Sequence, residues 1–193
     1  MKLKYDPTSV VKHVIELSGG HDAFFEKSHA ELNRLNAVWK QDSLTIGRIL
    51  RAHVFVEHFL NELLRAKNPG LGPLDKARLT FAQKVSLVGP ESPEVEDLLP
   101  GIRRLNQIRN RLAHSLHADL TTEDADVLLN CSLFRAMRDE DARHISEIAS
   151  TKPIDVVEDF ALHVGGRIQS HVSGAAEVWA EAFRLVEEEA SNS

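Results

Sequence analysis

Residues 98–118, LLPGIRRLNQIRNRLAHSLHA, combine a helical apolar pattern with a charge opposite to that of the whole chain. The stretch has four arginines, two histidines and no acidic residue, whereas the chain has 29 Asp and Glu against 23 Lys and Arg. Its leucines and isoleucines recur at spacings of three, four and seven residues, which places them on one face of a helix. We therefore predict an amphipathic helix whose polar side is locally basic.

The polar residues of this helix are not evenly distributed around it. At about 100° per residue, Arg109 falls close to the apolar stripe, and Asn106, Asn110, His114 and His117 follow one of its edges. A guanidinium beside an apolar face keeps its charge, so it requires an anion, backbone carbonyls or a site that uses it. Arg109 is therefore the first candidate for a functional residue.

A second helical pattern supplies polar groups that can meet Arg109. Apolar residues recur at helical spacing from position 46 to position 64, and His53 and Glu57 lie at the centre of that stripe. We predict that the two helices pack together, with His53 and Glu57 against Arg109. A buried ion pair that only holds two helices in register remains the alternative interpretation.

Length and composition indicate an ordinary globular chain. It has 193 residues, of which 42% are hydrophobic and 27% charged, and we predict one domain spanning residues 1–193. The net charge of −6 and the pI near 5.9 argue against a nucleic-acid binder that uses its whole surface. The single cysteine, Cys131, allows no internal disulfide and fits a reducing compartment.

Several classes of segment and site are not expected. We find no signal-peptide pattern and no apolar run of membrane-spanning length, so we expect a cytoplasmic protein without membrane contact. A glycine-rich phosphate loop, a zinc CxxC pair and a nucleophile elbow are also missing. His114 and His117 have no third ligand at motif spacing, so we expect neither a metal nor a cofactor.

Helical periods bounded by turn residues cover most of the remaining chain, and strand signals are almost absent, which predicts an all-α bundle. Segment 10–17 fits a short helix or strand, and segment 138–152 fits a frayed helix or loop. A glycine pair at 165–166 and Gly174 interrupt the last pattern, where we expect a break or a close helix contact. The other expected helices cover approximately residues 22–40, 42–67, 74–88, 92–117, 125–137 and 153–186.

The sequence Arg109-Asn110-Arg111-Leu112-Ala113-His114 has the form Arg-Asn-x-x-x-His at the end of a helix. This motif, together with the preceding segments IGRILRAHVFVEHFLNELL and LTFAQKVSLV, resembles the HEPN superfamily and the related mannitol-operon-repressor type. The resemblance covers approximately residues 42–118. It implies a HEPN-like helical core with an additional N-terminal part and a C-terminal helical extension over residues 121–190.

Members of that superfamily are often metal-independent endoribonucleases, frequently toxins of toxin-antitoxin or defence systems, and they typically act as dimers. The resemblance thus implies RNA as substrate, a homodimer, and an antitoxin or regulatory protein as partner. Other members are non-catalytic nucleotide-binding, RNA-binding or regulatory modules, which is the alternative. We expect the dimer contact to involve Phe55 and Phe59, on the other side of their helix, or the flanks of the motif helix. The expected site residues are Arg109, Asn110 and His114 for catalysis, His53 and Glu57 in support, and Arg103, Asn106, Arg111 and His117 for substrate binding.

Overall fold

The structure is a computed structural model that describes residues 5–39, 42–70, 72, 74, 76–89, 92–116, 118–144 and 148–191. These residues form helices joined by turns, without any strand, so the predicted all-α class is confirmed. Internal contacts divide the chain into two compact units, residues 1–43 and 44–193. Almost all of the expected core, residues 42–118, lies in the second unit together with the C-terminal helices. No helix in the described ranges is long and apolar enough to cross a membrane.

The first unit consists of α1 (Pro7–Leu17) and α2 (His21–Trp39). Asp6 caps α1 by accepting hydrogen bonds from the backbone N–H groups of Thr8 and Ser9. Gly19 and Gly20, with φ of 92° and 105°, form the turn before α2. Segment 10–17, whose sequence fits either a helix or a strand, is thus helical. Neither α1 nor α2 buries any of its residues.

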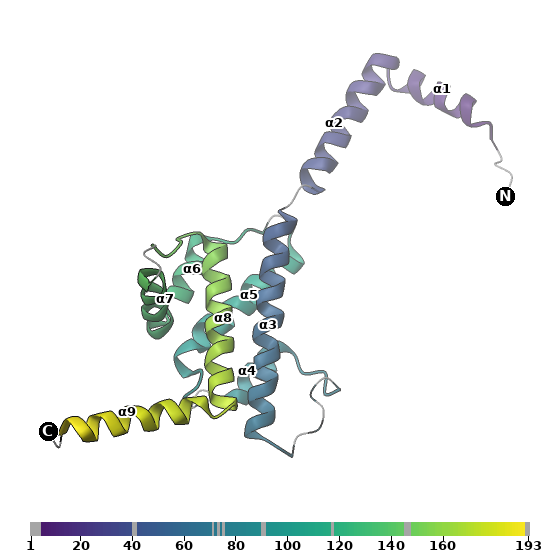
Figure 1. The fold of residues 1–193 in the computed structure, drawn as a ribbon. Helices are drawn as coiled ribbons and strands as arrows, with labels where there is room; N and C mark the ends of the chain where they lie inside the picture. Colours follow the sequence, from purple (N-terminus) through teal and green to yellow (C-terminus); the bar gives the residue numbers. More distant parts are fainter. Residues whose placement is uncertain are drawn as a thin grey trace. The chain divides into compact units, whose positions relative to one another are not determined.

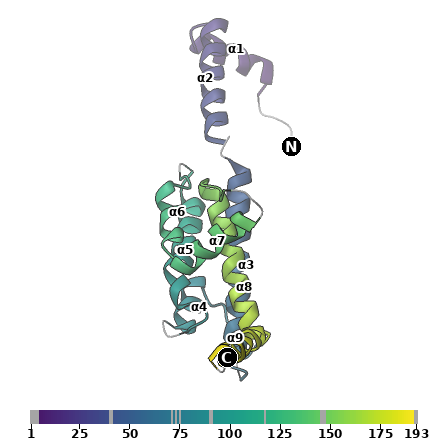
Figure 2. The same cartoon turned by 60° about the vertical axis from the view of Figure 1, so that its left-hand side comes forward.

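The second unit contains one short 3₁₀ helix and the remaining α-helices, which two views of the fold show (Figures 1 and 2). Their bounds are α3 (Ser43–Lys67), α4 (Phe81–Val88), η1 (Glu96–Leu98), α5 (Leu99–His114), α6 (Thr122–Leu129), α7 (Ser132–His144), α8 (Pro153–Val172) and α9 (Ala175–Ser191). Helices α3 and α8 run side by side, and beside this pair α5 packs against α4 and against α6 (Figures 1 and 2).

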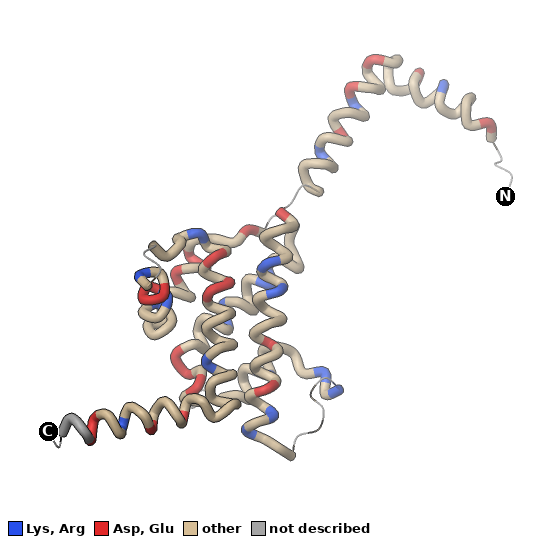
Figure 3. Tube along the Cα trace, in the orientation of Figure 1, with Lys and Arg blue, Asp and Glu red and all other residues tan. Residues whose placement is uncertain are grey.

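The core lies between α3, α5 and α8. Val56, Leu105, Ile108 and Phe160 are completely buried in it. Complete burial of such a side chain contributes about 1.5–3 kcal/mol relative to exposure, so these residues hold the three helices together. At the edge, Arg48 of α3 donates hydrogen bonds to Asp155 and Glu158 of α8, at 2.8 and 2.6 Å. Figure 3 shows this meeting of basic turns on α3 and acidic turns on α8.

Glycines allow two close contacts between helices. Gly165 of α8 lies against the rings of Phe55 and Phe59, which are packed edge to face with their centroids 4.9 Å apart. Gly101 of α5 likewise makes room for the ring of Phe160. The expected close contact at residue 165 is therefore present, while α8 continues unbroken to Val172. Phe55 and Phe59 pack against the core of their own chain and remain partly exposed, so their place at a contact between subunits stays a prediction.

Other predicted helix bounds were wrong, for identifiable reasons. The helix expected from residue 74 begins at Phe81, because Arg78 has a left-handed φ of 50° and Thr80 forms a capping box with Gln83. The helix expected over 125–137 is two helices, with the break at residues 130–131. Helix α7 then extends to His144, through a segment expected to fray, because Glu140 pairs with Arg143 and His144 within the helix.

The helix expected from residue 92 also begins later than predicted. Residues 96–98 form a 3₁₀ turn, and α5 starts at Leu99. Pro100 therefore lies in the first turn, where its missing N–H costs nothing, and does not divide the helix. The last helical pattern breaks only at Gly174, whose φ is 76°.

The close contact at Gly165 predicts opposite effects for two adjacent substitutions. A Cβ at Gly165 would lie 2.5 Å from a ring carbon of Phe55, whereas a Cβ at Gly166 would meet nothing within 4 Å. We expect Gly165→Ala to lower the free energy of unfolding by about 1–2 kcal/mol, because the rings must move. Gly166→Ala should be neutral or stabilise by up to about 1 kcal/mol. Urea unfolding followed by circular dichroism measures both, and equal stabilities would contradict the packing.

Candidate functional site

The expected catalytic and binding residues of α5 form a polar strip, here called the α5 strip: Arg103, Asn106, Arg109, Asn110 and His114. Arg103, Asn110 and His114 share one side of the helix at spacings of seven and four residues. The side chains of Arg103 and His114 are exposed, and those of the other three are partly buried. The strip therefore reaches solvent along the last three turns of the helix.

His53 of α3 lies next to the strip and is held from two sides. Its Nε2–H donates to the side-chain oxygen of Asn106 at 3.2 Å. The ring of Phe81, from α4, lies against the imidazole with 4.2 Å between centroids. Burial lowers the pKa of His53 below its usual 6.5, and the positive charges of Arg109 and Lys84 act in the same direction. His53 is therefore neutral at pH 7 and serves as a fixed hydrogen-bond donor to the strip.

Glu57, one turn further along α3, binds a cation other than the expected one. Its carboxylate accepts a hydrogen bond from Nζ of Lys84 at 2.6 Å, and Lys84 is itself buried. The expectation that Glu57 meets Arg109 is thus not what the structure shows. The cause is the position of α4, which inserts Lys84 beside α3. Glu57 still lies near His53. The negative charge of the Glu57 carboxylate raises the pKa of His53 and so acts against the lowering by burial.

Arg109 is left with a neutral contact. One of its Nη atoms donates to the side-chain oxygen of Asn110 at 3.1 Å. Among the described residues, neither Arg109 nor Arg103 takes part in an ion pair. A partly buried guanidinium that is bound only to a neighbouring amide retains donors for an anionic ligand.

Two other arginines of α5, unlike Arg109, have an acidic partner, which is Asp124 of α6. Its carboxylate is completely buried and binds Arg104 Nε at 2.8 Å and also Arg111. The same carboxylate accepts a hydrogen bond from the backbone N–H of Thr121, as part of a capping box that starts α6. Arg111 was expected to bind substrate. The structure instead assigns Arg104 and Arg111 to a structural ion pair with Asp124.

One expected residue falls outside the part of the chain that is described, and one class of site is not found within that part. His117 lies between the described ranges, so its role in substrate binding stays a prediction. No group of three or more His, Cys, Asp or Glu residues in those ranges is arranged to hold a metal ion.

Two residues that sequence reasoning missed complete this region, and the signals for them differ. Asp124 stands three residues after Thr121, which is the spacing of a capping box; that spacing indicates a helix start but not the other partners of the carboxylate. Lys84 stands at the spacing of a buried position, three residues after Phe81. A lysine in a short amphipathic helix is ordinarily exposed, so only the neighbouring Glu57 makes its burial understandable.

Asp124 leads to a prediction about stability and pH. Burial raises the pKa of Asp124, but hydrogen bonds from the Thr121 backbone and from Arg111 outweigh this and hold it below its usual 3.8. We expect Asp124→Asn to reduce the free energy of unfolding by about 2–3 kcal/mol at pH 7, because two arginines lose their carboxylate. A lowered folded pKa means that this contribution is complete above the unfolded pKa and is lost as pH falls through the folded pKa. The difference between wild type and variant should therefore narrow below about pH 3.8.

Urea unfolding at pH 7 and at about pH 3 tests this pH dependence. Glu123→Gln is the matched control, because Glu123 binds the same Arg104 but is 81% exposed. We expect that change to cost less than about 0.5 kcal/mol. Similar losses in the two variants, or a difference that does not depend on pH, would contradict the structural role of Asp124.

Comparisons with known proteins add no relative from which a function could be carried over. No protein-family model, no curated protein and no solved structure matches this chain. A functional assignment consequently depends on the residues of the α5 strip and on their surroundings.

Proposed function

We propose that this protein is a metal-independent endoribonuclease of the HEPN type, and that the α5 strip is its active site. One observation carries the proposal. Of the arginines on α5, Arg104 and Arg111 are bound by the buried Asp124, whereas Arg109 is bonded to Asn110 and has no carboxylate partner among the described residues. His114 follows one turn after Asn110, on the same side of the helix. Arg109 with Asn110, and His114 one turn further along, would offer a cation, an amide and an imidazole to a phosphodiester.

The residue types suit RNA cleavage without a metal. In that reaction the ribose 2′-oxygen attacks the adjacent phosphorus, its proton passes to a base, and the 5′-oxygen leaves with a proton from an acid. His114 is exposed and is the group for proton transfer. Arg109 binds the phosphate oxygens as negative charge develops on them, and Asn110 positions the phosphate or the imidazole. His53 and Asn106 support the strip from its buried side.

One imidazole per chain accounts for one of the two proton transfers. We therefore propose a homodimer in which His114 of each chain serves a shared cleft. Arg103 is exposed on the same side of α5 as His114 and extends the positive surface along an RNA strand. A protein that cleaves cellular RNA requires control, so a toxin or defence role with an inhibitory antitoxin belongs to the same proposal.

A non-catalytic module that binds a nucleotide, RNA or a regulatory partner is the second candidate. The observation that favours it is the ion pair between Glu57 and Lys84, because Glu57 was expected to orient Arg109. Since Glu57 does not do so, Arg109 is held by Asn110 alone among the described residues. Such a site retains phosphate affinity but positions the guanidinium less rigidly, and this favours binding over turnover.

Incubation of the purified protein with mixed RNA in EDTA tests the first candidate. We expect cleavage by wild type that leaves 2′,3′-cyclic phosphate ends. His114→Ala should lower the rate by about 100-fold or more, since proton transfer by a positioned side chain contributes about 10²–10⁴-fold. Arg109→Ala should lower it by a similar factor, because it removes charge stabilisation at the phosphate.

Controls separate loss of chemistry from loss of folding. His29→Ala and Arg135→Ala change exposed residues of the same types on α2 and α7 and should retain wild-type rates. Circular dichroism and a mass measurement in solution show whether each variant is folded and dimeric. Retained cleavage by folded His114→Ala would reject the assignment. Saturable RNA binding without cleavage by folded wild-type protein would favour the binding module.

A further inference from the structure

The first unit leaves its apolar side chains unburied. Neither α1 nor α2 has a buried residue. Single exposed apolar residues are ordinary on a protein surface, whereas a large group of them marks an interaction site. The exposed large apolar residues of these two helices are Val10, Val11, Val14, Leu17, Phe25, Leu32, Leu35, Val38 and Trp39.

The apolar residues of α2 follow the pattern of a helix that packs along another helix. A stripe with spacings of three, four, three and four residues runs the length of α2, and we call it the α2 seam: Phe25, Ser28, Leu32, Leu35 and Trp39. This heptad pattern places knobs into the holes of a facing helix. Helix α1 has 11 residues against 19 in α2, and the seam stays exposed beside it, with Leu35 at 68% and Trp39 at 87%.

A unit of this size needs a partner for its apolar surface. Helices gain most of their stability from packing of an apolar face, and isolated helices shorter than about 12–15 residues are marginal in water. Domains below about 40 residues usually depend on oligomerisation, a metal or disulfides. The first unit spans residues 1–43 and has no cysteine. Oligomerisation is therefore the available means of covering the α2 seam.

The charges of α2 allow two identical helices to meet along this seam. From Phe25 to Trp39 the seam has no charged residue, and Glu31 is the only permanently charged residue at the positions that flank it. The other charges of this span, Glu26, Lys27 and Arg34, lie on the outer side of the helix. Like-charge repulsion, which opposes the pairing of identical helices, is consequently small.

The exposed apolar area also fits a stable pair. Helix α1 adds a stripe of its own beside the seam, formed by Val10, Val14 and Leu17. At about 150–250 Å² for a large side chain, the two stripes leave on the order of 700 Å² exposed in each copy. A standard stable interface buries about 800 Å² on each partner.

We propose that the α2 seam is a self-association surface, covered by the α2 seam of a second copy of this chain. In a two-fold contact the same patch serves both partners, so one seam in each copy is sufficient. Residues 21–39 lie outside the segment that resembles HEPN proteins, and the contact uses no residue of the α5 strip. The proposal therefore does not depend on ribonuclease activity.

Cross-linking of the full chain tests the proposal without RNA. Leu32 is at the middle of the seam, so a thiol there lies near its counterpart whether the helices run parallel or antiparallel, with axes about 8–10 Å apart. We expect Leu32→Cys to form a covalent dimer with a short bismaleimide. Ala30→Cys, exposed on the opposite side of α2, is the matched control and should react about tenfold more slowly. Wild type should give no dimer, because Cys131 is buried.

A second pair of variants tests the seam itself in the Leu32→Cys background. Leu35→Lys should lower cross-linking about tenfold or more, because each copy would bury a charge in the paired seam. Ala37→Lys adds the same charge on the outer side and should change nothing. Leu35 is 68% exposed in its own chain, so its replacement removes little internal packing. Circular dichroism checks that helicity is retained.

Three outcomes would overturn the proposal. They are the absence of cross-linking at position 32, equal cross-linking at positions 30 and 32, and unchanged cross-linking in Leu35→Lys. A dimer held through α5 alone would not distinguish the two sides of α2. Failure of this contact is therefore separate from failure of the RNA cleavage assay.

Discussion

The buried carboxylate of Asp124 is the interaction on which the arrangement of α5 depends. It binds Arg104 and Arg111 from α5 while it caps the start of α6 through Thr121. A completely buried charge is costly unless its partners are in place, so the two helices are held in one register. On the same helix His114, three residues after Arg111, is exposed, and Asn110 is partly exposed.

The same register determines which arginine is available. The four arginines of α5 look alike in the sequence, yet two of them neutralise Asp124, and Arg109 is left with an amide. On the buried side, Lys84 takes the carboxylate of Glu57, and His53 stays neutral against Asn106. Arg109 therefore has no carboxylate partner among the described residues, which is the property on which the proposed phosphate site depends.

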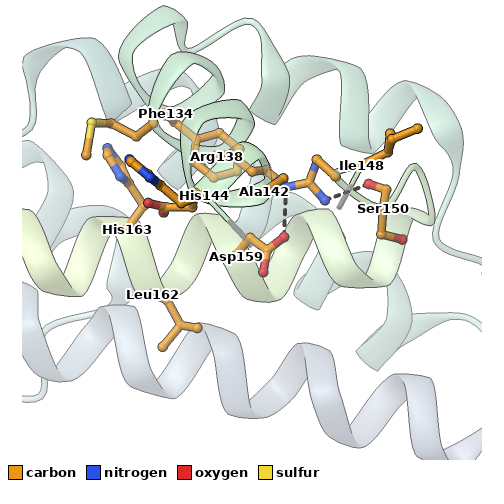
Figure 4. A pocket seen from close by; sticks show the side chains of 12 residues that line it. Phe134, Arg138, Ala142, His144, Ile148, Ser150, Asp159, Leu162 and His163 are labelled. Carbon is orange, nitrogen blue, oxygen red and sulfur yellow. Dashed lines mark hydrogen bonds and ion pairs between the residues drawn. The ribbon is translucent and has the colours of Figure 1, made fainter. Parts of the chain in front are cut away.

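A second group of charges lies on α7 and α8. There Arg138 of α7 is bound by Asp159 of α8 and by the backbone carbonyl of Ser150 (Figure 4). This pair connects α7 to α8, as the pairs of Arg48 with Asp155 and Glu158 connect α3 to α8.

Local signals predicted most of the helices correctly. Turn residues at 68–70 and the capping pattern at 121–124 mark helix ends, because they act over one turn and need no tertiary partner. Bounds failed where the determining feature is conformational or distant, as with the left-handed φ of Arg78. The pairing of α5 with the helix of His53 was predicted from polar residues on two apolar faces, and the His53–Asn106 bond agrees with it.

The sequence by itself determined the all-helical class, the helix that carries Arg109 and His114, and the polar character of its strip. These follow from periodicity and residue type, which are local properties. Only the tertiary structure decided which charges are paired: Glu57 with Lys84, Arg104 and Arg111 with Asp124, and Arg138 with Asp159. Pairing depends on which helices approach each other, and side chains far apart in the sequence compete for the same partner.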